Sequence, residues 1–225
     1  YLTFKENVMK NKELLLEISY CCNQKCIHCS SIGIDCDQII KVTELPFYLH
    51  NSEEGSSYLD EIETVRLSGG EISLLHNLKL YVDFFKNHNI KVIVQTNGRI
   101  SLDKSVLRKI DEVWVSLYGN EYIHDFITQQ RGSYNSVNNT LMFYSKYLHE
   151  FSKAKIVIQS PIFNEKQMIS LFCQMNTCLW NNNFDTELRL FALLNQGKCN
   201  FALTREEQLA IYNSLQYKYY KTIIT

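Results

Sequence analysis

The stretch "TVRLSGGEISLLHNLKLYVDFFKNHNIKVIVQTNG" (64–98) contains two short apolar runs separated by an amphipathic segment. The runs at 64–70 and 91–98 are rich in β-branched residues and end in glycine, as strands that stop at a turn do. The segment between them, 77–89, has apolar residues at helical spacing. Two adjacent parallel strands need a crossover of this kind. We therefore expect a strand–helix–strand unit of a parallel sheet.

The same alternation continues in both directions along the chain. Further strands are expected at 14–20, 112–119, 155–162 and 187–197, and further helices at 101–110, 133–152, 164–180 and 204–220. A helix also belongs somewhere in 38–60, where Pro46 makes the pattern ambiguous. Six βα units predict an α/β fold with a parallel sheet covered by helices. This periodicity fits a doubly wound sheet and a partial barrel equally well.

Several of the expected helices begin with residues that cap helix N-termini well. Ser101, Asn164 and Thr204 are the candidate N-caps. Glu207 lies three residues after Thr204, which is the spacing of a capping box. No repeat or linker indicates a second domain, so we expect a single domain over residues 1–225, with βα units from about 14 to 218.

The composition is that of a globular protein, with 45% hydrophobic and 21% charged residues. The formal net charge of −1 gives no reason to expect binding to nucleic acid or to an anionic membrane. No apolar run approaches the roughly 20 residues that cross a bilayer, and the first residues contain no apolar signal core. The eight cysteines then suggest metal binding or chemistry in a reducing compartment, and we expect a cytoplasmic protein.

Glycine marks the ends of the expected strands. Of the eight glycines, five lie at these C-terminal ends: Gly69, Gly70, Gly98, Gly119 and Gly197. In parallel α/β folds this edge binds ligands, because the loops that follow the strands converge there. A turn often needs glycine for its own conformation. Five on one edge nevertheless favour a shared ligand site.

The densest group of cysteines is "SYCCNQKCIHCS" (19–30), directly after the first expected strand. Cys22, Cys26 and Cys29 are spaced C-x3-C-x2-C. A structural zinc site would need a fourth ligand, and His28 lies between two of the thiols, where its ring would point away from their common centre. A cubane iron–sulfur cluster bound by three cysteines would leave one iron open. We expect Cys21 to be a small buried side chain and not a ligand.

The motif on the loop after the first strand resembles that of the radical S-adenosylmethionine (radical SAM) superfamily. "LSGGEISL" (67–74) is similar to that family's GGE motif, and "QTNG" (95–98) and "VSLYG" (115–119) end the next strands in the same way. "HDFITQQRGSYNSVNNTL" (124–141), "PIFNEKQM" (161–168) and "LRLFALLNQGKC" (188–199) resemble segments of MoaA-like and peptide-modifying members. The resemblance is to a branch without the cysteine-rich C-terminal extension of many peptide-modifying relatives, so we expect no C-terminal auxiliary-cluster domain.

The resemblance implies a partial (β/α)6 TIM-type barrel that binds one [4Fe–4S] cluster and S-adenosylmethionine (SAM). Cys22, Cys26 and Cys29 would bind the cluster, and SAM would chelate the open iron. Site residues that would contact SAM are Gly69, Gly70 and Glu71 at the methionine amine, Asn97 and Ser116 at the ribose or carboxylate, the backbone around His28 at the adenine, and Gln159. The strand at 155–162 lacks the family's usual glycine, so Gln159 and Ser160 are weaker assignments.

The same resemblance implies an enzyme that cleaves SAM reductively and abstracts hydrogen from a substrate. The motifs at 116–143 favour a ribosomally made peptide, as in an epimerase or cross-linking enzyme, and a nucleotide or other small molecule is the alternative. An electron donor such as flavodoxin or ferredoxin would be the protein partner. A different class, a non-catalytic iron–sulfur or zinc protein, would have no use for Glu71 beside two glycines.

The remaining candidates are isolated side chains. His124 follows the strand expected to end at 119, and it is the only histidine considered as a candidate for substrate contact. Cys36 is expected to be a bystander near the cluster. An auxiliary cluster on Cys173, Cys178 and Cys199 is disfavoured, because the first two are five residues apart on one helix and point in different directions.

Overall fold

The computed structural model describes residues 2–5, 12–31, 34–51, 56–178, 186–191, 204–216 and 223–224. The strands are β1 (Leu2–Lys5), β2 (Glu13–Ser19), β3 (His50–Asn51), β4 (Ser56–Ser57), β5 (Thr64–Gly69), β6 (Lys91–Thr96), β7 (Glu112–Ser116), β8 (Lys155–Pro161), β9 (Thr186–Phe191) and β10 (Ile223–Ile224). The α-helices are α1 (Leu45–Tyr48), α2 (Leu78–Asn87), α3 (Lys104–Leu107), α4 (Glu121–Thr128), α5 (Ser133–Phe151), α6 (Glu165–Cys178) and α7 (Arg205–Gln216). Three short 3₁₀ helices are η1 (Val42–Glu44), η2 (Tyr58–Asp60) and η3 (Ile72–Leu74).

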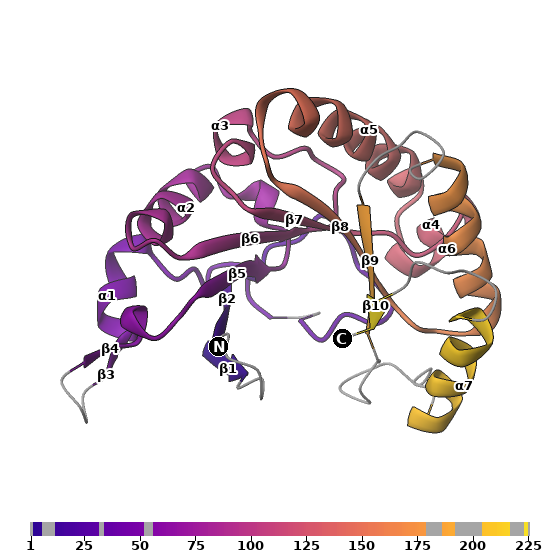
Figure 1. Cartoon of the computed structure of the whole chain (residues 1–225), viewed down its shortest axis with the longest axis horizontal. Coiled ribbons are helices and arrows are strands. Elements are labelled where there is room, and N and C mark those ends of the chain that lie inside the picture. The colour runs from indigo at the N-terminus through magenta and orange to yellow at the C-terminus, as the bar shows by residue number, and fades with distance from the viewer. Residues whose placement is uncertain are drawn as a thin grey trace.

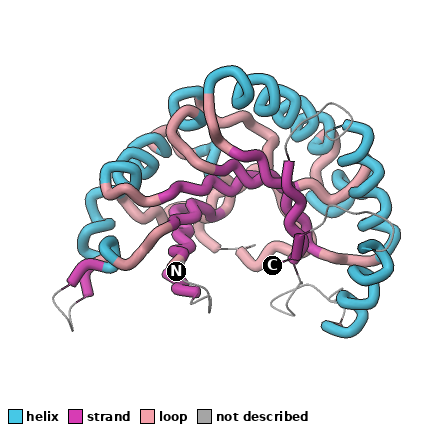
Figure 2. The backbone as a smooth tube through the Cα atoms, in the orientation of Figure 1, coloured by secondary structure: helices cyan, strands magenta, loops and turns pink. Residues whose placement is uncertain are grey.

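The main sheet has the strand order β1-β2-β5-β6-β7-β8-β9-β10. All neighbours in it are parallel except β1, which pairs antiparallel with β2. Figure 1 shows the sheet curving into an arch, with the helices on its convex side. Figure 2 makes the two layers plain, an inner layer of strands and an outer layer of helices. The fold is therefore a partial TIM-type barrel, as the resemblance implied, and not a doubly wound sheet.

The register of the strands divides their side chains between two faces. Alternate residues such as Leu16, Leu67, Val94, Val115 and Ile158 are buried in the main core, which also contains the buried faces of the helices. The intervening residues face the concave side, where a separate cluster consists of Ile93, Trp114 and Val157. Because both faces are largely covered, the strands are nearly continuous apolar runs, which is why they were visible in the sequence.

Polar contacts also hold the concave face together. The guanidinium groups of Arg66 and Arg189 lie over the Trp114 ring, 4.7 and 4.3 Å from its centroid. Arg66 pairs with Glu13 (3.0 Å), and Arg189 pairs with Glu187 (2.8 Å). The middle of the concave side is thus filled by a charge-balanced stack around one indole, below the strand ends.

All six strands predicted from the sequence are present, with ends shifted by a few residues or truncated before the turn residues. The predicted strand at 187–197 is described only to Phe191. The sequence patterns did not predict β1, β3, β4, β10 or helix α4. In 38–60 the expected helix is split into η1, α1 and η2, and Pro46 lies in the first turn of α1, where its missing N–H costs nothing.

The capping predictions had different outcomes. Thr204 and Glu207 form the expected capping box, with reciprocal bonds of 2.7 and 3.2 Å, and Asn164 accepts the N–H of Gln167 (2.9 Å). Ser101 was wrong: Asp103 caps α3 by accepting the N–H of Ser105 at 2.7 Å. The helix begins late because the N–H of Leu102 is held by the hydroxyl of Tyr144, 2.8 Å away.

No helix among the described residues combines the length and the apolar character needed to span a membrane.

Candidate functional site

The cysteine loop follows β2 and lies against the end of β5. The N–H of Gly70 donates to the carbonyl of Ser19 (2.6 Å), and the N–H of Glu71 donates to the carbonyl of Cys21 (2.7 Å). A Cβ atom on Gly69 would lie 2.1 Å from the Ser19 oxygen, and one on Gly70 would lie 2.2 Å from the Cys21 oxygen. The two glycines therefore allow one backbone to approach the other, a requirement that exists without any ligand.

The three predicted ligands lie close enough together to affect one another electrostatically. Burial raises the pKa of Cys26 to about 12, with further contributions from the charges of Cys22 and Cys29. Burial also raises the pKa of Cys22, and the charges of Glu71 and Cys29 act in the same direction. Three thiolates here would repel one another, so a cationic centre among them would stabilise the ionised forms that bind metal.

This donor set fits an iron–sulfur cluster by its chemistry. Three thiols on one short loop suit a group whose external ligands are cysteine thiolates, and Lys25, the one basic residue between them, is exposed. In the described part of the chain, no three His, Cys, Asp or Glu side chains converge as a single metal ion would require. A cubane cluster does not require that convergence, because each cysteine binds a different iron.

Cys21 lies outside this set of thiols. Its sulfur is directed to the carbonyl of Cys36, 3.4 Å away. We expected Cys21 to be buried, and this was wrong: it is half-exposed, and its thiol bonds to the carbonyl of an exposed residue instead of packing in the core. Cys36 itself is exposed.

Glu71 is buried where η3 begins, and its carboxylate is the acceptor for three donors. The N–H of Ser73 (2.9 Å) and the hydroxyl of Thr96 (2.6 Å) bond to Oε1, and the N–H of Asn97 (2.6 Å) bonds to Oε2. An ionised carboxylate can accept about four hydrogen bonds. Glu71 therefore joins the ends of β5 and β6, and it has about one acceptor position left for a ligand.

Asn97 connects the end of β6 to the cysteine loop. Its amide donates to the side chain of Asn23 (2.7 Å) and lies 3.9 Å from the sulfur of Cys22. Arg99 also reaches the loop, with a bond from its guanidinium to the carbonyl of Asn23 (2.6 Å). Asn23 and Arg99 were not predicted from the sequence, since only the tertiary fold brings residues more than 70 positions apart into contact.

Ser116 and Gln159 are opposite each other on β7 and β8, and the amide of Gln159 donates to the hydroxyl of Ser116 (3.2 Å). Both face the concave side of the strands near their C-terminal ends. Ser160 points the other way and accepts from Gln167 of α6 (2.9 Å). The assignment of Ser160 to adenine was therefore wrong, because side chains alternate between the faces of a strand.

The ring of His28 packs among aromatic side chains. It meets Tyr118 and Phe163 edge-on, with centroid distances of 5.2 and 5.3 Å, and its Nε2 lies 3.5 Å from the Tyr118 hydroxyl. Burial lowers the pKa of His28 to about 4, so the ring is neutral at physiological pH. Burial and the nearby charge of Cys26 raise the pKa of the Tyr118 hydroxyl well above its usual value.

The C-terminal end of helix α4 hydrogen-bonds to the cysteine loop, a contact that the sequence did not predict. The N–H groups of Lys25 and Ile27 donate to the carbonyls of Thr128 and Ile127, at 3.2 and 2.9 Å. Asp125 at the middle of this helix accepts the N–H of Gly132 (2.5 Å) and of Tyr134 (2.8 Å), which caps α5. The loop that carries the thiols is thus fastened to both helices.

His124, the candidate histidine for substrate contact, lies inside the protein and not at the site. The side chain is fully buried, and it bonds to the N–H of Tyr118 through Nδ1 (3.3 Å) and to the hydroxyl of Ser133 through Nε2 (3.1 Å). Its ring also stacks on Tyr118. Both ring nitrogens are therefore used inside the protein.

The burial of His124 predicts a pH dependence of stability. Burial lowers its pKa from 6.5 to about 4, so the unfolded chain binds a proton that the folded chain does not bind between these values. The contribution of His124 to stability should be complete above about pH 6.5 and should fall by about 2 kcal/mol on acidification to about pH 5. His28, whose pKa burial also lowers to about 4, adds a loss of its own that remains in a variant of His124. Urea unfolding of His124→Gln should show a smaller loss over this range. The exposed His149 is the control, and His149→Gln should retain the full loss; equal losses in all three proteins would contradict the assignment.

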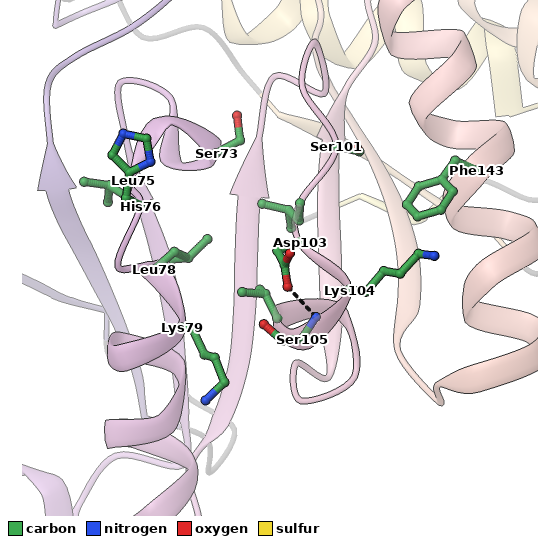
Figure 3. Close-up of a pocket in the computed structure, with 12 residues that line it drawn as sticks. Ser73, Leu75, His76, Leu78, Lys79, Ser101, Asp103, Lys104, Ser105 and Phe143 are labelled. Carbon is green, nitrogen blue, oxygen red and sulfur yellow. Dashed lines mark hydrogen bonds between the residues drawn. The ribbon is translucent and has the colours of Figure 1, made fainter.

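A pocket of about 710 Å³ opens on the helical side of the fold, between α2, α3 and α5. Figure 3 shows its lining, in which Asp103 is occupied in capping α3. Ser73, whose N–H bonds to Glu71, also lines it. None of the residues predicted to bind the cluster or SAM lines this pocket, so it is a separate feature.

Some of the predicted residues lie partly or wholly outside the described structure. Gly197 and Cys199 are not among the described residues, and the side chain of Cys178 is not described. Cys173 on α6 is exposed.

The fold is similar to several solved structures at low sequence identity. SuiB from Streptococcus suis bound to S-adenosylmethionine aligns with a TM-score of 0.70 and 13% identity, over 95% of this chain and 50% of that one. Histidine-tagged anSMEcpe with bound AdoMet aligns with a TM-score of 0.69 and 18% identity, over 94% of this chain and 63% of that one. A radical SAM methyltransferase from Sphaerobacter thermophilus gives a TM-score of 0.72 and 11% identity, over 100% of this chain and 68% of that one.

These similarities establish a shared fold. The chain spans 50% of the length of the SuiB structure and 63% of the length of the anSMEcpe structure. No protein-family model matches the sequence, and no curated protein matches it.

Proposed function

We propose that this chain is the catalytic core of a radical SAM enzyme that binds one [4Fe–4S] cluster through Cys22, Cys26 and Cys29. The observation that carries the proposal is the joining of three elements at one sheet edge. The cysteine loop bonds to Glu71 through the Cys21 carbonyl, and Glu71 bonds to Asn97, whose amide reaches back to Cys22. Solved structures of the same fold, named as radical SAM or SAM-bound proteins, support this reading.

The residues of the chain would hold SAM by complementary charge and hydrogen bonding. The half-exposed backbone at Gly69 and Gly70 would accept from the methionine ammonium, and the charge of Glu71 beneath it would add attraction. Asn97 would donate to the methionine carboxylate, and the Ser116–Gln159 pair would bind ribose or adenine from the concave side. The backbone around His28 would meet the adenine edge.

When bound, the cluster and SAM together supply a 5′-deoxyadenosyl radical that abstracts hydrogen from a substrate. The role of the protein is to position these groups and to exclude water and competing hydrogen donors. The cysteine loop is suited to this role, because α4 and the ends of β5 and β6 hold it on several sides.

The substrate we propose is a ribosomally made peptide, modified by epimerisation or cross-linking. SuiB bound to its precursor peptide SuiA has the same fold, with a TM-score of 0.67. A nucleotide or other small molecule is the alternative. A flavodoxin or ferredoxin would supply the electron, and the many free thiols would suit a reducing cytoplasm.

Anaerobic reconstitution tests the proposal. The chain is loaded with iron and sulfide, reduced with dithionite and incubated with SAM, and 5′-deoxyadenosine is measured by chromatography. We expect about four irons per chain and formation of 5′-deoxyadenosine. One zinc per chain without iron–sulfur absorbance would refute the proposal in favour of a structural metal site. Deuterated peptide or nucleotide candidates would then identify the substrate by transfer of the label into 5′-deoxyadenosine.

A further inference from the structure

A buried chain of polar side chains leads from α4 to one of the three cysteines. The Nε2 of His124 lies 3.1 Å from the Ser133 hydroxyl, and the Gln24 amide nitrogen lies 2.7 Å from the same hydroxyl. The thiol of Cys26 donates to the other end of that amide, the Gln24 Oε1, at 3.4 Å. The three linking side chains, His124, Ser133 and Gln24, are exposed by 0%, 0% and 8%, so solvent does not compete for their hydrogen bonds.

We infer that Gln24 is a positioning residue that donates a hydrogen bond to the Cys26 thiolate when the cluster is bound, and that Ser133 and His124 orient it. This rests on the proposed function, because it takes Cys26 as a cluster ligand. None of these three residues was assigned a role in binding the cluster by the sequence patterns.

The inference follows from counting donors and acceptors. A cysteine that binds iron is a thiolate and has no proton to donate. Gln24 Oε1 would then face a negative sulfur, which is unfavourable in a buried site. Rotation of the amide by half a turn exchanges its two ends, which have nearly the same shape, and places Nε2–H against the sulfur.

Ser133 and His124 can follow this rotation without losing a bond. The serine hydroxyl can both donate and accept, so it can donate to Gln24 Oε1 while it accepts from His124 Nε2–H. His124 cannot reverse, because its Nδ1 accepts the backbone N–H of Tyr118 (3.3 Å) and its proton must therefore be on Nε2. All hydrogen bonds in this series then point the same way: each group donates to the next, from the Tyr118 backbone N–H through His124, Ser133 and Gln24 to the Cys26 sulfur.

Gln24 is also well placed by its own backbone. The neighbouring Lys25 N–H is held by the carbonyl of Thr128 at the end of α4 (3.2 Å). The position of the amide is therefore determined by α4 and α5 and not by the loop alone.

Hydrogen bonds to cluster sulfurs affect the reduction potential, because a donor stabilises the extra negative charge of the reduced form. The test is Gln24→Met, which keeps the approximate volume and removes both polar ends, together with Ser133→Ala. After reconstitution, the midpoint potential is measured by redox titration followed by electron paramagnetic resonance, and iron content and the apoprotein melting temperature are measured in parallel. Gln38→Met, at an exposed glutamine, is the matched control.

We expect Gln24→Met and Ser133→Ala each to disfavour reduction by about tenfold, which is a shift of about 59 mV to lower potential for one electron. The double variant should shift no further than Gln24→Met, because the two residues act through one chain. Loss of iron from an apoprotein that melts at the wild-type temperature would also support the inference. If Gln24→Met does not fold, Ser133→Ala, which removes one hydroxyl, decides the question alone.

Wild-type potentials in both variants, with or without a lower melting temperature, would overturn the inference and leave the proposed function standing. Failure of the wild-type chain itself to assemble a cluster would instead remove the proposed function, and this is seen before any variant is made.

Discussion

Cys26→Ala is expected to abolish cluster binding, whereas Cys21→Ala, five positions earlier, is expected to preserve it. Cys26 is partly buried, and the charges of Cys22 and Cys29 act on its thiol. The thiol of Cys21 instead donates to the carbonyl of Cys36. Losing an outer partner of a metal ligand typically costs about 10–100-fold in affinity or activity, so losing a ligand should cost more. We therefore expect background iron content and no detectable 5′-deoxyadenosine from Cys22→Ala, Cys26→Ala or Cys29→Ala.

The measurements are iron and sulfide content and the absorbance of the reconstituted protein, made alongside the melting temperature of each apoprotein. Cys21→Ala is the matched control, since it removes an adjacent thiol and leaves the Cys21 carbonyl that accepts from Glu71. Cys173→Ala, at an exposed position on α6, controls for the loss of any thiol. Iron loss in Cys21→Ala with retention in Cys22→Ala would show that the ligand set had been assigned incorrectly.

The strands could be predicted along the sequence because they depend on local composition. Val92 and Val94 face the main core and Ile93 faces the concave cluster, so the strand is apolar throughout and stands out from its polar flanks. The curvature of the sheet could not be predicted from local composition. Whether six βα units form an open sheet or an arch depends on packing between distant helices, and for that the sequence offered only the resemblance to a known family.

Helix α4 shows why part of the site was missed. Its inward face carries His124 and Thr128, which are polar, while Tyr122 and Phe126 on the outside are exposed by 78% and 57%. Ile127 is also buried on the inward face, so polar and apolar residues are mixed there while large apolar side chains are exposed, and the periodicity did not predict the helix. His124 faces inward because its ring bonds to the N–H of Tyr118 and to Ser133 of α5. The backbone carbonyls at the end of the helix accept from the cysteine loop, and such partners are visible only in three dimensions.

The predicted site residues were found together for a simpler reason. Glu71, Asn97 and Ser116 each follow or end a parallel strand, and the carboxyl ends of such strands share one edge. The sequence did not predict which hydrogen-bond partners each of these side chains has. Glu71 was predicted to meet a ligand amine, and most of its acceptor capacity is instead used to join β5 to β6.

Gly70→Ala is expected to displace the cysteine loop, and Gly132→Ala is not. A Cβ at Gly70 would lie 2.2 Å from the Cys21 oxygen and 2.5 Å from the Tyr20 oxygen, both in the backbone, so the loop itself must move. At Gly132 nothing lies within 4 Å, and the only demand is its φ of +75°. The pair therefore separates a steric requirement from a conformational one.

For Gly132→Ala we expect a loss of about 1–2 kcal/mol, the usual cost of a left-handed non-glycine residue, with full iron content after reconstitution. For Gly70→Ala we expect a loss of about 3 kcal/mol or more from overpacking, together with loss of the cluster, because the carbonyls of Tyr20 and Cys21 must move and the Cys21 carbonyl is bonded directly to Cys22. Urea unfolding of the apoproteins and iron analysis of the reconstituted ones measure the two effects separately. If Gly70→Ala bound iron as well as Gly132→Ala does, the close contact between the end of β5 and the loop would not be what positions the thiols.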